Sequence, residues 1–190
     1  MTAALAPRAD RRHGRLWLAL GGTSAVALSL ALAPFPGCLF GVGLAVVATA
    51  IVHTDLREFR IPDVANLASA LLGLAACALD ASSAWDVAAV VARAAIMFGA
   101  LFAFRALYRF ARGRDGLGLG DVKLAGVAGL WLDAERLPVC WELACASALG
   151  WLLWRRWTTG APIAAVDRLA FGAFLAPAIW AVWLWQAATR

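Results

Sequence analysis

The chain has 190 residues, of which 63% are hydrophobic and only 15% are charged, and its formal net charge is +5. This composition excludes a disordered chain and argues against an ordinary soluble domain, in which apolar residues make up close to half. No basic surface interleaved with aromatic residues stands out, so we expect no nucleic-acid partner. We expect an integral membrane protein whose first partner is the lipid bilayer.

Apolar runs alternate with short polar or turn-forming stretches along the whole chain. Residues 1–15 form a basic segment, and the run 16–33 behind them is about long enough for one membrane span of roughly 20 residues. The turn-forming residues 34–37 do not resemble a small-residue cleavage site, although a removed signal peptide is the alternative. Further runs are predicted at 38–54, 64–79, 87–108, 122–132, 138–154 and 169–188.

This pattern predicts an all-α, polytopic transmembrane helix bundle with a cytosolic N-terminus. If every run crosses the bilayer, all Lys and Arg residues except Arg93, Arg136 and Arg190 lie on or near the cytosolic side. The run 122–132 would rise only about 16 Å as a helix, half of the hydrocarbon thickness, so we expect six to seven spans. We expect two parts, the cytosolic basic segment 1–15 and a single transmembrane domain, 16–190.

Two aspartates are expected at membrane depth, where ionisable side chains are costly. Asp55 lies at the cytosolic end of the second run and Asp121 at the cytosolic start of the short one, so both fall at the same face. Two carboxylates a few ångströms apart share a proton, and together they can activate a water and protonate a leaving amine. The pair therefore predicts the chemistry of an aspartic protease.

The residues around each aspartate admit a second interpretation. Gly118 and Gly120 permit a close backbone approach beside Asp121, but Asp121 is equally suited to cap the helix that follows it. Pro62 is predicted to open the third helix at its first position. The alternative for residues 55–63 as a whole is a solvated cytosolic loop.

Three stretches resemble motifs of the prepilin peptidase family of membrane aspartic proteases, also called type IV leader peptidases. Asp55 followed by Arg-Ile-Pro-Asp at 60–63 resembles the family's Asp, a short gap and Ile-Pro-Asn or Ile-Pro-Asp. Gly-Leu-Gly-Asp-Val-Lys-Leu at 118–124 is close to the family's Gly-x-Gly-Asp-x-Lys-Leu. Phe-Gly-Ala-Phe-Leu-Ala at 171–176 is similar to its Phe-Gly-Pro-Phe-Leu-Ala segment.

The resemblance implies roles for eight residues. Asp55 and Asp121 would be the catalytic aspartates, and the active-site loop and substrate positioning would involve Gly118, Gly120, Lys123, Arg60, Pro62 and Asp63. For Lys123 a plain anchor on the positive cytosolic side is the alternative. The implied substrate is a prepilin or pseudopilin, whose leader would be cleaved at the cytosolic face of the bacterial cytoplasmic (inner) membrane, with pilus or secretion machinery as a possible further partner.

The chain also departs from the family pattern. Ala170 and Ala173 stand where prolines are common. Long members carry an insertion with paired Cys-x-x-Cys motifs that bind zinc and accompany N-methylation, whereas the four cysteines here form no such pair. The chain thus resembles the short form that processes Flp-type pilins of the tight-adherence system, and we expect no metal and no cofactor.

Two other functions remain open at this point. Buried carboxylates also suit a small proton- or cation-coupled transporter. A catalytically inactive scaffold of a pilus or secretion assembly would keep the same fold without the reaction.

Overall fold

The computed structural model describes residues 8–113, 116–160 and 169–189, with the backbone alone for 8–15. Within these residues the chain forms seven α-helices and no strand. In chain order the helices are α1 (Arg8–Leu32), α2 (Gly37–Glu58), α3 (Asp63–Asp80), α4 (Ala84–Arg112), α5 (Leu119–Trp131), α6 (Leu137–Thr159) and α7 (Gly172–Ala188). Each predicted apolar run therefore corresponds to one helix, and the all-α bundle is confirmed.

Most of these helices have the length and composition of membrane spans. Four of them, α2, α3, α4 and α6, are long and apolar enough to cross a bilayer. Residues Leu16–Leu32 of α1 and the whole of α7 are shorter apolar helices. The protein is thus a multi-pass membrane protein. Helix α5 has 13 residues and rises about 20 Å, less than the roughly 30 Å of the hydrocarbon core, as its sequence predicts.

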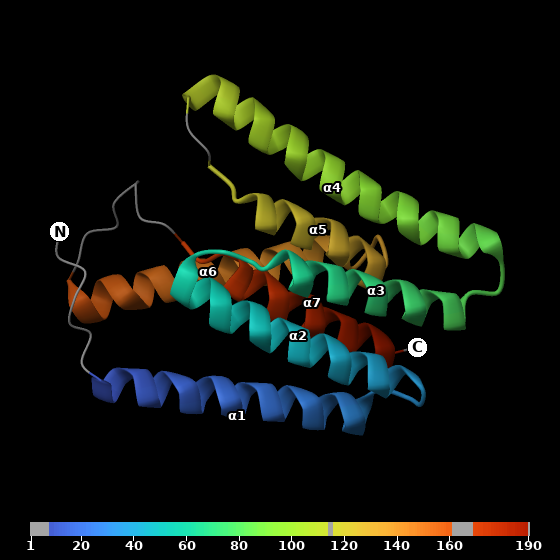
Figure 1. Cartoon of the computed structure of the whole chain (residues 1–190), viewed down its shortest axis with the longest axis horizontal. Helices are drawn as coiled ribbons and strands as arrows, with labels where there is room; N and C mark the ends of the chain where they lie inside the picture. Colours follow the sequence, from blue (N-terminus) through green and yellow to red (C-terminus); the bar gives the residue numbers. More distant parts are fainter. Residues whose placement is uncertain (1–7, 114–115, 161–168, 190) are drawn as a thin grey trace.

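The short helix α5 lies inside the bundle. It packs against α3, α4 and α7, whereas α1 and α4 lie at opposite sides of the bundle (Figure 1). Gly129 allows α4 to approach closely, because a Cβ at Gly129 would lie 2.7 Å from the Cα of Ala94. Arg93 donates from Nε to the Gly129 carbonyl at 2.9 Å, so the intramembrane arginine has a backbone partner.

Local signals fix the ends of the helices. Ser83 and Asp86 form a capping box at the start of α4, in which each side chain bonds to the other residue's backbone. Gly113 and Gly160 end α4 and α6 with φ of 67° and 66°, the left-handed conformation that glycine adopts without a Cβ penalty. Helix α3 begins at Asp63, one residue later than predicted, because Pro62 is extended and serves as the N-cap.

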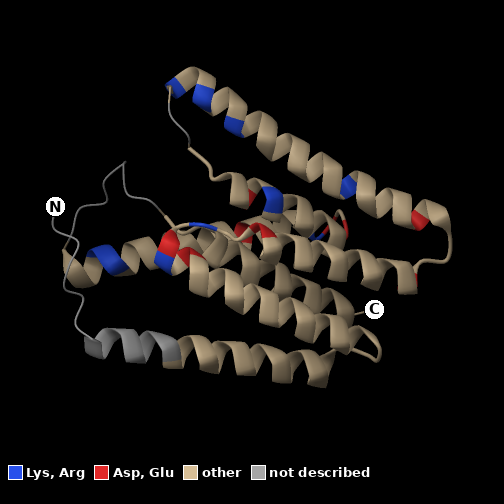
Figure 2. Ribbon diagram, viewed as in Figure 1, with Lys and Arg blue, Asp and Glu red and all other residues tan. Residues whose placement is uncertain are grey.

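Positive charge gathers at one end of the bundle (Figure 2). Helices α2, α4 and α6 finish at this end, and α3 and α5 begin there. Its basic residues are Arg57, Arg60, Arg105, Arg109, Arg112, Lys123, Arg155 and Arg156. Arg136 lies at the opposite end, stacked 3.7 Å over the Trp185 ring near the end of α7. The basic residues that the sequence assigns to one side of the bilayer therefore do lie at one end of the bundle, and that end is the one predicted to face the cytosol.

Candidate active site

Asp55 occupies the last turn of α2 and is buried, with 4% of its surface exposed. Its Oδ2 accepts a 2.9 Å hydrogen bond from the backbone N–H of Ala173, and the backbone of Gly172 also bonds to the carboxylate. Both donors belong to the first turn of α7, whose N–H groups have no partner within the helix. The solvated-loop alternative is wrong for Asp55, although Arg57 and Arg60 behind it are exposed.

Asp121 is the third residue of α5 and faces the same end of the bundle. The backbone of Gly118, the N-cap of α5, bonds to its carboxylate, so Asp121 does contribute to capping. Its Oδ1, however, is buried and has no hydrogen-bond partner among the described residues. Capping therefore uses only part of the carboxylate and leaves a buried acceptor for other chemistry.

The electrostatics of Asp121 link it to Asp55. Burial, and to a smaller degree the negative charge of Asp55, raise the pKa of Asp121 to about 6, against a smaller opposing effect of the Gly118 hydrogen bond. Burial disfavours the charged form of a carboxyl, and a like charge nearby adds to this. A carboxyl with this pKa gains and loses its proton close to neutral pH, which is the range that general acid–base catalysis needs.

Ile61 joins the three motif stretches in space. It is buried, with 5% exposure, and its Cβ lies 2.9 Å from the position that a Cβ on Gly120 would occupy. The Ile61 side chain also fills the position of a Cβ on Gly172, and the Oδ2 of Asp55 lies 3.0 Å from that position. The two glycines are therefore required by close packing. Ile61 belongs to one of the sequence motifs, which predict no role for it.

Other predicted residues lie around this centre. Lys123 donates from Nζ to Oδ1 of Asp63 at 2.6 Å, which joins the starts of α3 and α5. Pro62 accepts backbone hydrogen bonds from Ala65 and Asn66 and so opens α3 beside the site. Arg60 is exposed in the turn between α2 and α3. Gly118 leaves room for the Asp121 side chain, because a Cβ on Gly118 would lie only 2.9 Å from the Oδ2 of Asp121.

Asn66 is a site residue that the sequence motifs do not predict. It lies on α3 with 5% exposure, and its Nδ2 donates to the carbonyl oxygen of Gly120 at 3.4 Å. The available signal was a polar amide inside an otherwise apolar run, because a buried amide needs hydrogen-bond partners.

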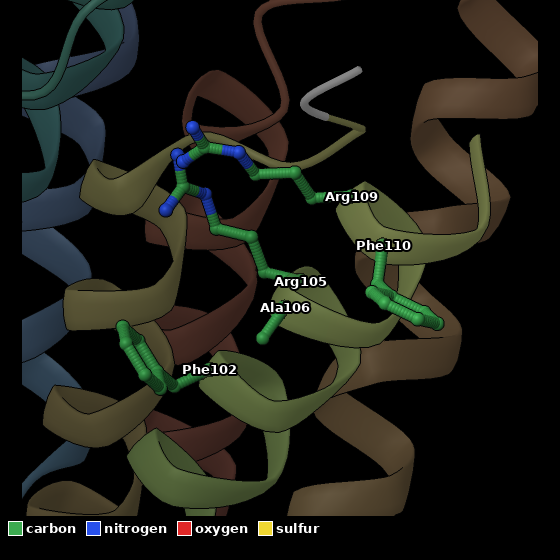
Figure 3. Close-up of a pocket in the computed structure, with 5 residues that line it drawn as sticks. All are labelled: Phe102, Arg105, Ala106, Arg109 and Phe110. Atoms are coloured by element: carbon green, nitrogen blue, oxygen red, sulfur yellow. The ribbon is translucent and has the colours of Figure 1, made fainter. Parts of the chain in front are cut away.

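The start of the active-site loop is held from α4. Arg105 donates from Nε to the Leu117 carbonyl at 2.9 Å. Arg105 and Arg109 extend in the same direction from α4 (Figure 3) and line a cavity of about 520 Å³ with Phe102, Ala106 and Phe110. Neither aspartate lines this cavity. Among the described residues, no three His, Cys, Asp or Glu side chains gather as a metal site would require.

Comparison with known proteins places this arrangement in a family. Residues 42–153, which include both aspartates and α5, match the model of the type IV leader peptidase family. The chain belongs to the type IV leader peptidase family. This confirms the resemblance found in the sequence motifs.

Two curated proteins similar to this family member are each named "Prepilin leader peptidase/N-methyltransferase". The protein of Aeromonas hydrophila is 30% identical over 166 residues, which cover 84% of this chain and 54% of that protein. The protein of Burkholderia pseudomallei (strain K96243) is 29% identical over 165 residues, which cover 87% of this chain and 52% of that protein. The chain thus spans about half the length of the curated relatives it matches. No solved structure matches this leader peptidase family member.

Proposed function

We propose that this protein is a membrane aspartic endopeptidase that removes the leader of a prepilin or pseudopilin. The observation that carries the proposal is the pairing of Asp55 and Asp121 at one end of the bundle, with the Oδ1 of Asp121 buried and its pKa raised to about 6. Membership of the type IV leader peptidase family and the names of the relatives support the substrate class.

In the proposed mechanism the two carboxyls have opposite starting roles. Asp55 starts ionised as the general base toward water, a role favoured by the N–H donors of Ala173 and Gly172. Asp121 starts protonated and gives its proton to the scissile carbonyl oxygen as the water attacks, a role that suits a buried carboxyl whose Oδ1 has no partner among the described residues. Asp55 then gives the proton taken from water to the departing amine, and Asp121 recovers its own when the tetrahedral intermediate collapses.

The remaining predicted residues are proposed to shape the substrate groove. Gly118 and Gly120 keep the loop narrow beside Asp121, and the Lys123–Asp63 ion pair with Pro62 fixes the start of α3 against it. Arg60 lies exposed in the turn between α2 and α3, and we propose that it contacts the substrate there.

The whole of 16–190 would act as one peptidase domain behind the basic segment 1–15. The clustered positive charge supports a site at the cytosolic face of the bacterial cytoplasmic membrane. Pilus or secretion machinery remains the proposed further partner of the domain.

Co-expression with candidate prepilins tests the function. Wild type, Asp55→Asn, Asp121→Asn and the control Glu58→Gln are compared at equal membrane abundance, and loss of the leader is followed on a gel. Glu58 is an exposed carboxylate at the end of the same helix as Asp55. We expect each aspartate variant to lose activity by about a hundredfold or more and the control to retain it. Native-rate cleavage by either aspartate variant would overturn the proposal.

The buried carboxylates also favour a second candidate, a proton- or cation-coupled transporter. If the wild type cleaves no candidate, ion flux measured in proteoliposomes separates this function from that of an inactive scaffold. Flux that Asp55→Asn abolishes supports transport, and absence of flux supports the scaffold.

A further inference from the structure

Asn66 is buried in the proteolytic site without an assigned role. It lies on the first turn of α3, and its backbone N–H bonds to the Pro62 carbonyl, so the local helix fixes its position. Its Nδ2 reaches the Gly120 carbonyl, 54 residues away in the chain. Gly120 directly precedes Asp121, so this contact holds the peptide from which the Asp121 side chain extends.

Two buried oxygens adjoin that peptide without a donor from the described residues. They are the Oδ1 of Asn66 and the Oδ1 of Asp121. A buried acceptor that stays unpaired costs about 1–3 kcal/mol. The Oδ1 of Asn66 is always an acceptor, and the Oδ1 of Asp121 accepts whenever it does not itself carry the proton, so the two fit a group with two hydrogen-bond donors, and water is such a group.

We propose that Asn66 is a positioning residue of the peptidase site, whose Nδ2 fixes the Gly120 carbonyl and whose Oδ1 accepts a hydrogen bond from the attacking water. This inference rests on the proposed function. The amide would orient the water between the two carboxyls, and it would hold Asp121 at its present depth. Asn66 has no part in the proton transfers themselves, which remain with Asp55 and Asp121.

Three variants separate this role from simple packing. Asn66→Leu keeps the shape and removes both hydrogen bonds, and we expect kcat to fall about tenfold to a hundredfold with KM nearly unchanged. Ser69→Ala is the matched control, because Ser69 is also buried on α3, one turn further along, and its hydroxyl has no partner in the described part of the chain. Its backbone carbonyl, which accepts from Trp131, is unaffected by the change. We expect this variant to cleave at the wild-type rate.

Asn66→Asp tests the hydrogen bond itself. When its carboxyl is ionised it cannot donate to the Gly120 carbonyl, and when it is protonated it donates as the amide does. The ratio of variant to wild-type activity should therefore rise as the pH falls, whereas the ratio for Asn66→Leu should stay low. The ratio corrects for the titration of Asp55 and Asp121 that both proteins share, and the exposed Lys123–Asp63 pair is common to both. The ionised carboxylate that Asn66→Asp introduces acts in the same direction by raising the pKa of Asp121.

A readout that does not need cleavage completes the test. Infrared titration of the Asp121 carboxyl should show a lower midpoint in Asn66→Leu than in wild type, because a released loop lets this side chain reach water, and no change in Ser69→Ala. An unchanged midpoint, or full activity of Asn66→Leu when the wild type cleaves, would overturn the positioning role. A folded wild type that cleaves no prepilin would instead overturn the proposed function, and the titration would still decide whether Asn66 positions Asp121.

Discussion

The backbone N–H of Ala173 lies 2.9 Å from the Oδ2 of Asp55, although 118 residues separate them in the chain. The donor comes from the first turn of α7, where the helix carries partial positive charge. The acceptor comes from the last turn of α2. One helix thus supplies the carboxylate and another supplies the groups that orient it.

Ala173→Pro measures how much the Ala173 N–H contributes to orienting Asp55, because proline has no N–H to donate. Proline is common at this position in the family, and the backbone of Gly172 still bonds to the Asp55 carboxylate, so we expect cleavage to fall only about threefold. The proline itself should be tolerated in the first turn of α7. Ala173→Gly keeps the donor and serves as the control. Leader cleavage per unit of membrane-inserted protein is the measurement, and a loss of about a hundredfold or more in Ala173→Pro alone would show that Gly172 cannot orient Asp55 by itself.

Gly120→Ala should impair both stability and cleavage. The added methyl group would lie 2.9 Å from the Cβ of Ile61, which cannot swing away as the end of a flexible side chain can. Forcing a methyl group into such packing costs about 1–3 kcal/mol and would shift the loop that carries Asp121. Thermal unfolding in detergent and cleavage assays measure the two effects.

Gly150→Ala is the matched control for this substitution. A Cβ at Gly150 meets nothing within 4 Å, so the variant should be as stable as wild type or slightly more stable, since alanine favours helix. If Gly120→Ala and Gly150→Ala behave alike, packing against Ile61 does not explain the glycine.

Asp121 should titrate near pH 6, and this midpoint should fall in Asp55→Asn. The negative charge of Asp55 disfavours ionisation of Asp121 and so raises its pKa. Removing that charge lowers the pKa, but burial keeps it above the ordinary value of 3.8. Infrared titration measures the carboxyl, with Asp121→Asn spectra subtracted to identify the band. A midpoint that stays at the wild-type value would show that the two groups are electrostatically independent.

The Lys123–Asp63 pair should affect cleavage more than stability. Its side chains are 42% and 68% exposed, so water and salt screen the attraction and the unfolding temperature of single variants should change little. Lys123→Glu places like charges at the start of α3 and α5, and we expect cleavage to fall several-fold. The double variant Lys123→Glu/Asp63→Lys should recover it. A double variant as impaired as Lys123→Glu would mean that Lys123 acts apart from Asp63.

The sequence by itself determined the helices, their order and the family. Lipid offers the backbone no hydrogen-bond partner, so an apolar run inside the bilayer must satisfy its N–H and C=O groups within the segment. An α-helix does this, and each apolar run therefore predicts a helix. The length of the run 122–132 alone predicts a helix too short to span the bilayer, and α5 has 13 residues. Asp55 and Asp121 were also identified from their motifs, which are local features.

Only the tertiary structure decided which groups meet. The donor from Ala173, the packing of Ile61 against Gly120 and the amide of Asn66 all join residues far apart in the chain. Such contacts depend on how the helices are rotated against one another, which periodicity in α3 and α5 does not specify. The amide of Asn66 stands out in an apolar run, but its function is not a local property, because it depends on the carbonyl that another helix presents to the amide.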